Sequence, residues 1–351
     1  MKRIPSLILA APLLLCIACE LGELSDPGGD GGSKRPDAST PINPPTDHDA
    51  GSAARDAGSQ PGGDTSVDAG AGGGPGLDGG SGFDGGSVLD GGSDDGRGAV
   101  RSAGCGTVST KLKNNPQGSG GSASTVNKLK VGGKDREFLV RWPSDYNQAT
   151  PYRLILGLHG HGGSWQESGL TNYGLWSLSK GSTIFVTLSA IDGNWDDADL
   201  TYTDEVLKLV EGELCIDTSR VMAEGFSQGA WMAAYLGCAR PGVFRAVAAH
   251  SGSYEGTCSN VAFLGSVGLN DIMGMSQTSE TDPFAKVNQC TVEKLPAAPS
   301  GKHACTPYKG CKTGFPVTWC SFDGGHDYQP KDSGASSSWM PQTVWDFLSQ
   351  F

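Results

Sequence analysis

The chain has 351 residues and a formal net charge of −12, from 38 acidic and 26 basic residues. The charge is uneven, because residues 20–100 hold 15 acidic and 4 basic residues, whereas residues 101–351 hold 23 and 20. A C-terminal part this close to neutral lacks the basic surface of nucleic-acid-binding proteins, so we expect no nucleic-acid partner. About 250 residues suit one folded domain, which we predict over residues 101–351.

The first 19 residues have the features of an export signal. Lys2 and Arg3 precede an apolar run over residues 7–18 that is too short to span a bilayer comfortably. Cleavage before Cys19 would fit a lipoprotein signal, although Cys16 stands where such signals usually carry leucine. An ordinary cleaved signal is the alternative. Both predict an extracellular or cell-surface protein, whose membrane contact is at most a lipid on Cys19.

Residues 20–100 consist mostly of glycine, aspartate, serine, proline and alanine, and Asp-Gly-Gly-Ser recurs at 78–81, 84–87 and 90–93. Such a segment has too little apolar surface to offset the entropy of ordering it, so we predict a disordered acidic linker. Calcium binding by the repeats is a weaker alternative, because their period is six rather than nine. A tether between an anchor and a folded domain is the better interpretation.

Eight cysteines lie in the predicted folded domain: Cys105, Cys215, Cys238, Cys258, Cys290, Cys305, Cys311 and Cys320. An even set in an exported protein predicts disulfides, up to four of them, with a connectivity that the sequence does not fix. A zinc site is the competing interpretation, disfavoured because these cysteines contain no C-x-x-C pair. We expect no metal and no cofactor.

Apolar strands alternate with helical patterns from Cys105 onward. The expected strands span residues 137–142, 153–158, 183–189, 220–224, 246–250, 261–267 and 317–322, and the expected helices 204–214, 228–236 and 342–347. This alternation predicts an α/β fold with a mostly parallel, twisted sheet and helices on both faces.

The pentapeptide Gly225-Phe226-Ser227-Gln228-Gly229 lies between an expected strand and an expected helix. In α/β-hydrolases a G-x-S-x-G turn at this place lifts the serine onto a strained, exposed elbow, and the glycines avoid collisions with neighbouring backbone. Ser227 is therefore the predicted nucleophile.

A glycine-rich loop, His159-Gly160-His161-Gly162-Gly163, follows the expected strand 153–158. The corresponding loop of α/β-hydrolases supplies one backbone N–H of the oxyanion hole. We predict that the N–H groups of His161 and Gln228 form this hole. The imidazoles of His159 and His161 are expected to pack the loop rather than to catalyse.

The general base should lie near the C-terminus, because this fold orders its triad as serine, acid, histidine. His326 follows the expected strand 317–322 directly and is the predicted base, with His250 as the main rival. The acid should follow the strand after the elbow unit, which points to Asp271.

Three other aspartates compete with Asp271 for the role of the acid, namely Asp282, Asp323 and Asp327. Asp323 and Asp327 lie so close to His326 in sequence that we expect them to shape its loop instead.

Further runs of sequence resemble the secreted feruloyl esterases, relatives of the polyhydroxybutyrate-depolymerase-like and family-one carbohydrate esterases. The segments that carry the match, besides the elbow, are TYTD at 201–204, CIDTSRV at 215–221, CARP at 238–241, YKGC at 308–311, GFPVTWC at 314–320, FDGGH at 322–326 and WDF at 345–347. The resemblance covers essentially all of residues 104–351. It implies Ser227 as nucleophile, Asp271 as acid and His326 as base, in agreement with chain order.

Two departures from the family pattern lie near the expected acyl pocket. Ala230 and Trp231 follow the elbow where another glycine is common, and residues 272–275 (Ile-Met-Gly-Met) replace a frequent proline. Trp165, Trp195 and Trp231 could offer a flat aromatic surface to a cinnamoyl ring or a sugar. Packing in the core is the alternative for each of them.

Together these features predict an exported, monomeric serine esterase that hydrolyses feruloyl or acetyl esters of xylan through an acyl-enzyme. Depolymerisation of polyhydroxybutyrate or a similar polyester by the same triad is the alternative enzymatic function. A non-catalytic surface-binding module is the alternative outside enzymes, and it predicts a broken triad.

Overall fold

The computed structural model describes residues 98–115, 125–166, 172–273 and 275–351. The predicted signal (1–19) and the linker up to residue 97 lie outside these residues. The chain divides into two units, Met1–Gly82 and Phe83–Phe351, and every described residue belongs to the second. Val100 is already bonded to the folded domain, because its N–H donates to Asp217 Oδ1 (3.0 Å) and its carbonyl accepts from Thr218 N–H (2.8 Å).

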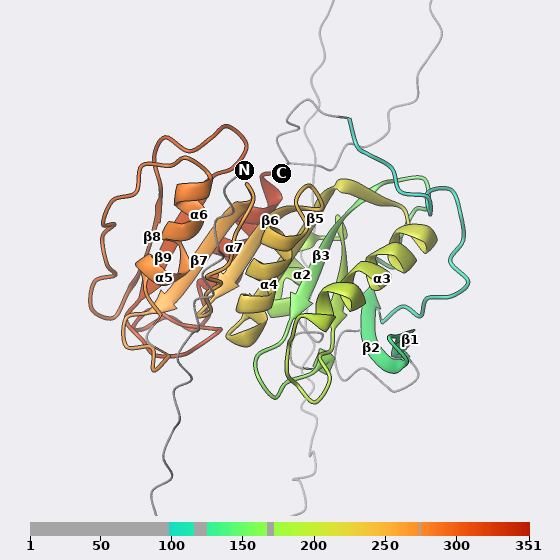
Figure 1. Cartoon of the computed structure of the whole chain (residues 1–351), viewed down its shortest axis with the longest axis horizontal. Helices are drawn as coiled ribbons and strands as arrows, with labels where there is room; N and C mark the ends of the chain where they lie inside the picture. The colour runs from blue at the N-terminus through green and yellow to red at the C-terminus, as the bar shows by residue number, and fades with distance from the viewer. Residues whose placement is uncertain (1–97, 116–124, 167–171, 274) are drawn as a thin grey trace, which may run out of the picture. The chain divides into compact units, whose positions relative to one another are not determined.

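Nine strands form one sheet in the order β1-β2-β4-β3-β5-β6-β7-β9-β8 (Figure 1). Their bounds are β1 (Asn127–Val131), β2 (Lys134–Arg141), β3 (Tyr152–Leu158), β4 (Thr183–Leu188), β5 (Ile216–Phe226), β6 (Phe244–His250), β7 (Ala262–Gly268), β8 (His303–Pro307) and β9 (Val317–Phe322). The six strands from β4 to β9 in this order run parallel, whereas β2 pairs antiparallel with β4, and β8 with β9. The predicted α/β fold with a mostly parallel sheet is confirmed.

Helices cover both faces of this sheet (Figure 1). The helices whose bounds lie within the described residues are α2 (Leu175–Ser179), α3 (Ala198–Glu213), α4 (Gln228–Ala239), α5 (Gln277–Glu280), α6 (Asp282–Val287) and α7 (Met340–Ser349), with a 3-10 turn, η2 (Asn172–Gly174). Side chains of α3, α4 and α6 share one core with Leu154 and Leu156 of β3. Ile155, between them, faces a second core with α2 and α7. In the described part of the chain, no helix has the length and apolar character needed to cross a bilayer.

The strands that the sequence does not predict, β1 and β8, are short edge strands. Each has five residues, and their exposed or half-exposed positions leave no continuous apolar run. β8 is also held from outside its own sequence, because Cys305 pairs with Cys320 of β9 both in the ladder and through a disulfide. Sheet pairing and a covalent bond, rather than local periodicity, decide these strands.

All eight cysteines of the domain are paired. The disulfides are Cys105–Cys215, Cys238–Cys258, Cys290–Cys311 and Cys305–Cys320. The prediction of four disulfides is confirmed, and the competing zinc interpretation is wrong, because no thiol of this set is left to ligate a metal. Cys238–Cys258 fixes the loop after β6 to the end of α4, and Cys105–Cys215 fixes the chain before β1 to the residue that precedes β5.

A buried ion pair anchors the loop between β4 and α3. The Arg136 guanidinium of β2 pairs with Asp199 of α3, donates to the Ser189 carbonyl (3.0 Å) and lies 3.8 Å from the centre of the Tyr202 ring. Asp199 also accepts from the N–H of Asp196 (2.8 Å), although burial raises the pKa of its carboxyl. A buried ion pair adds little net stability, because the desolvation of the two charges offsets their attraction. Its main effect is to fix geometry. Here it fixes the loop that carries Trp195.

Candidate active site

Ser227 lies on a sharp turn between β5 and α4, with a left-handed φ of 56° and ψ of −120°. Its N–H donates to the His250 carbonyl (2.8 Å). A Cβ at Gly225 would lie 2.2 Å from the Gly229 carbonyl oxygen, and one at Gly229 would lie 2.2 Å from the Leu158 carbonyl oxygen. Only glycine fits at either position, and the strained serine is held by the backbone around it. The strand–turn–helix geometry expected around Ser227 is confirmed.

Asp271 and His326 meet across the loops that follow β7 and β9. The Nδ1 of His326 donates to Asp271 Oδ2 (2.9 Å) and Oδ1 (3.1 Å). The Asp271 side chain is fully buried, whereas 19% of the His326 side chain is exposed. Two backbone bonds join the loops, from Leu269 N–H to the Phe322 carbonyl and from Asn270 N–H to the Gly324 carbonyl, each 2.9 Å. The two loops therefore hold acid and imidazole as one unit.

The serine lies at the same edge of the sheet as this pair, because β5, β7 and β9 are parallel and all three residues follow a strand's carboxyl end. The ring of Phe226, next to Ser227, lies 4.6 Å from the His326 ring. Within the described residues, no hydrogen bond joins Ser227 Oγ to His326. Such bonds are often long in ligand-free enzymes and tighten with substrate. The catalytic roles of the three residues stay a prediction.

His250, the rival base, has a buried side chain that contacts the neighbouring strand β7. It is 2% exposed, and its Nδ1 lies 2.7 Å from Ser266 Oγ on β7. Burial lowers the pKa of His250 to about 4, so its imidazole is neutral at pH 7. Its contribution to the elbow is its carbonyl group, which holds the N–H of Ser227.

The three rival acids all have other partners. Asp282 accepts from the Tyr308 hydroxyl, Asp323 from the N–H of Gly301 (2.7 Å), and Asp327 from a backbone N–H two residues on (2.8 Å). Asp323 and Asp327 thus shape the loop around His326, as expected. Among the described residues there is no group of three or more His, Cys, Asp or Glu side chains that could hold a metal ion.

The glycine-rich loop after β3 lies against the elbow, where an oxyanion hole would form. Gly162 N–H donates to the Gly193 carbonyl (2.9 Å). The side-chain amide of Gln228 clamps Trp195, accepting from its backbone N–H (3.3 Å) and donating to its carbonyl (3.4 Å). Because α4 begins at Gln228, the N–H of Gln228 has no acceptor within the helix. His161 is exposed in the same loop. The side-chain clamp is a feature that the sequence does not reveal.

His159 and Trp195 form the base of this loop. The buried His159 accepts the Ala190 N–H at Nε2 (3.0 Å), so its proton is on Nδ1, which donates to the Gly160 carbonyl (2.7 Å). Trp195 donates from its indole nitrogen to the His159 carbonyl (2.8 Å), and the two rings lie 4.7 Å apart. His159 packs the loop, as expected.

The three candidate substrate-binding tryptophans differ in exposure. Trp195 is 4% and Trp165 is 8% exposed, and the Trp165 indole donates to Glu137 Oε2 (3.2 Å). Neither indole presents the flat, open face that the sequence led us to expect, because burial with a partner for the N–H is the stable arrangement of these rings. Trp231 is partly exposed on α4, its backbone N–H donates to the Ser227 carbonyl (3.1 Å), and its ring lies 5.3 Å from Tyr235.

Exposed apolar side chains gather on the two loops of the acid and the base. We call this set the apolar rim: Leu269 (46% exposed), Ile272 (86%), Met273 (56%) and Tyr328 (38%). The Tyr328 ring also lies 5.5 Å from Phe226 and 5.9 Å from Tyr173. Exposed apolar groups beside a reactive site mark a binding surface. In the sequence, the only sign of it is the Ile-Met run that replaces the usual proline.

Glu224 lies on β5, three residues before Ser227, and is fully buried. Within the described residues, neither of its carboxyl oxygens has a hydrogen-bond partner. Burial therefore raises the pKa of Glu224 well above its usual value, because the buried site disfavours the charged carboxylate. The folded state therefore holds this proton to a higher pH than the unfolded chain, in which the carboxyl has its ordinary pKa of 4.5.

The wild-type protein therefore loses stability as the pH rises from about 4.5 toward the pKa of Glu224 in the folded state. In this range the unfolded state binds fewer protons than the folded state does. Glu224→Gln removes this dependence of the free energy of unfolding on pH. We expect the variant to gain stability relative to the wild type between pH 5 and pH 8, measured by urea unfolding. The matched control is Glu205→Gln on the exposed face of α3. Parallel stability curves for the wild type and Glu224→Gln would contradict the assignment.

No family model matches the chain. Similar curated proteins are feruloyl esterases of fungi: a probable feruloyl esterase C of Aspergillus clavatus is 34% identical over 234 residues, covering 61% of this chain and 83% of that protein. Feruloyl esterase D of Neurospora crassa is 32% identical over 275 residues, covering 72% and 91%. Among solved structures, an acetyl xylan esterase from Aspergillus awamori aligns with a TM-score of 0.49 at 12% identity, over 64% of this chain and 99% of that chain.

Proposed function

The chain belongs to the feruloyl esterase family and is a serine carboxylic ester hydrolase, and from this we propose that it is an exported enzyme that releases hydroxycinnamoyl groups from plant cell-wall polysaccharide through Ser227, His326 and Asp271. The observation that carries the proposal is the geometry at one edge of the sheet. There, a strained serine, a half-buried imidazole and a buried carboxylate follow three parallel strands.

In the first half of the reaction, Ser227 Oγ attacks the ester carbonyl and His326 Nε2 takes its proton. Asp271 accepts from Nδ1, which orients the ring and stabilises the imidazolium that forms. The N–H groups of Gln228 and His161 donate to the developing oxyanion, and each such donor contributes about 10²–10³ in rate. The C–O bond then breaks, His326 returns the proton to the sugar alkoxide, and the acyl group stays on Ser227.

In the second half, a water molecule attacks the acyl-enzyme as His326 removes its proton. The same oxyanion donors stabilise the second tetrahedral intermediate. Its collapse releases the carboxylic acid and returns the proton to Ser227. These steps use only side chains and backbone groups of the chain.

The apolar rim supports a bulky aromatic acyl group over an acetyl group. We propose that a cinnamoyl ring covers the exposed side chains of Ile272 and Met273 near Tyr328, because an acetyl group has too little apolar surface to do so. Each large side chain buried against a ligand contributes up to about 1.5–3 kcal/mol. Trp231, one helical turn beyond Ser227, is left for the sugar side of the ester.

The four disulfides support the proposal that the protein works outside the cytoplasm. We propose a monomer that is either free outside the cell or anchored by a lipid on Cys19.

Kinetics on methyl ferulate test the triad. Ser227→Ala should lower kcat by about 10⁶-fold, because the nucleophile is lost. Asp271→Asn should lower it by about 10⁴-fold, because the asparagine amide favours the wrong imidazole tautomer. Asp327→Asn, next to the base but bonded to the backbone, is the matched control and should leave kcat close to that of the wild type.

Equal rates for the wild type and Ser227→Ala would show a non-catalytic module instead. Turnover of polyhydroxybutyrate, with none of methyl ferulate or acetylated xylan, would show the polyester alternative.

A second experiment tests the acyl side. Ile272→Ser with Met273→Ser should lower kcat/KM for methyl ferulate about tenfold or more, because apolar contacts to the ring are lost. The rate with p-nitrophenyl acetate should hardly change. Val292→Ser, at another exposed apolar position, is the control. An equal loss for both esters would mean that the rim stabilises the loop and does not select the acyl group.

A further inference from the structure

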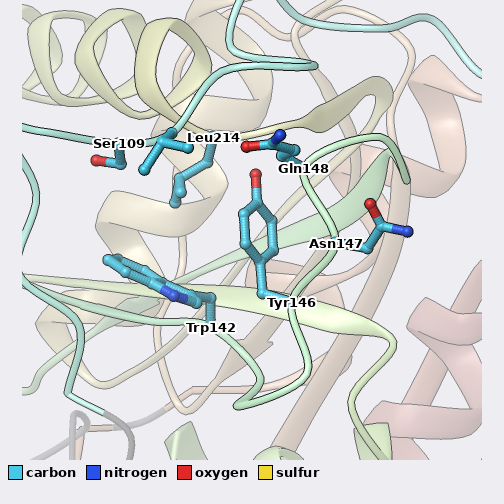
Figure 2. Close-up of a pocket in the computed structure, with 7 residues that line it drawn as sticks. Ser109, Trp142, Tyr146, Asn147, Gln148 and Leu214 are labelled. Carbon is cyan, nitrogen blue, oxygen red and sulfur yellow. The ribbon is translucent and has the colours of Figure 1, made fainter.

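A concave site lies at the opposite edge of the sheet from Ser227. This β2–β3 pocket has a volume of about 490 Å³ and is lined by Val108, Ser109, Trp142, Tyr146, Asn147, Gln148 and Leu214 (Figure 2). Trp142 follows β2, residues 146–148 precede β3, and Leu214 precedes β5. Ser227 follows β5, at the strand's other end. The pocket is therefore no part of the candidate active site.

The chemistry of the lining is neutral, aromatic and rich in amides. None of the seven side chains is charged. The Trp142 and Tyr146 rings lie 6.3 Å apart, and burial raises the pKa of Tyr146, which keeps its hydroxyl neutral. A phosphate, a carboxylate or a cation would be desolvated here without a compensating charge. A purely apolar ligand would leave the Gln148 side-chain amide and the Trp142 indole N–H unpaired.

The walls of the pocket are fixed before any ligand arrives. Asn114 holds the Trp142 backbone from both sides, accepting its N–H at Oδ1 (3.0 Å) and donating from Nδ2 to its carbonyl (3.1 Å). The Tyr146 hydroxyl accepts the N–H of Cys215 (2.8 Å), which is disulfide-bonded to Cys105. A site fixed in this way loses little entropy when a ligand binds.

Two polar groups of the lining are available to a ligand. Among the described residues, neither the Trp142 indole N–H nor the Gln148 side-chain amide makes a hydrogen bond. Figure 2 shows Trp142, Tyr146 and Gln148 around the pocket, with Ser109 and Leu214 on the side of α3. Val108 is 76% exposed and Asn147 is exposed as well, so the mouth is open. A ligand longer than the pocket can continue into solvent there.

We propose that the β2–β3 pocket binds a segment of a neutral polysaccharide, with a sugar ring against Trp142 and its hydroxyl groups on the side-chain amide of Gln148. A sugar combines an apolar C–H face with a rim of donors and acceptors, and this pocket offers both counterparts. Its volume lies within the range of about 300–1,000 Å³ usual for ligand pockets. Holding the polymer at a second place raises the effective concentration of its esters near Ser227.

Calorimetry with xylohexaose, cellohexaose and methyl ferulate tests the proposal, using the full chain with Ser227→Ala so that no ester chemistry interferes. Trp142→Ala and Gln148→Ala, each added to this background, should weaken hexasaccharide binding about tenfold or more. Trp345→Ala, a half-buried tryptophan on α7, is the matched control and should keep the affinity. In the otherwise wild-type chain, Gln148→Ala should leave kcat on methyl ferulate unchanged.

Three results would overturn the proposal: unchanged affinity in both pocket variants, binding of methyl ferulate but of neither hexasaccharide at this pocket, or loss of sugar binding with Trp231→Ala instead. Circular dichroism checks that each variant is folded. If Trp142→Ala does not fold, the hexasaccharide affinity of Gln148→Ala alone tests the proposal. The proposed esterase function is tested separately by turnover of methyl ferulate. The sugar-binding proposal and the esterase proposal can therefore fail independently of each other.

Discussion

The close contact of four backbone segments at the elbow is the constraint on which the rest of the site depends. A Cβ at Gly225 would collide with the first turn of α4. A Cβ at Gly229 would lie 2.2 Å from the Leu158 carbonyl oxygen at the end of β3. The end of β6 lies against the same turn, because the carbonyl of its last residue, His250, accepts the Ser227 N–H. Any side chain at these glycines would push the serine away from the edge where its partners lie. The glycine loop after β3 is brought to Gln228 by the same contact.

The acid and the base depend on a second close approach. A Cβ at Gly268 would lie 2.2 Å from the Gly325 carbonyl oxygen, so the loops after β7 and β9 touch through their backbones. This contact keeps Asp271 buried and still within 2.9 Å of His326. Hydrogen bonds farther out, such as the Gln228 clamp on Trp195, align the oxyanion loop with the elbow. The site is thus built mainly from backbone contacts, with side chains added at the strand ends.

The sequence predicts those parts of the molecule that local chemistry decides. The parallel core strands are continuous apolar runs, and the order of Ser227, Asp271 and His326 along the chain follows from the order of the strands. The edge strands β1 and β8 escape prediction because pairing and a disulfide decide them. The burial of Trp165 and Trp195 depends on partners far away in the chain, Glu137 and the His159 carbonyl, that no local pattern reveals. The pairing of the eight cysteines likewise needs three-dimensional proximity.

The central claim is that Ser227 is the one residue that becomes acylated. A reactive phosphonate ester, which phosphonylates activated serines whatever the natural substrate, tests this directly when the product is analysed by intact mass spectrometry and peptide mapping. We expect a single adduct, located on the peptide that contains Ser227, and no adduct in Ser227→Ala. Labelling of another residue, or an unlabelled wild-type protein, would contradict it.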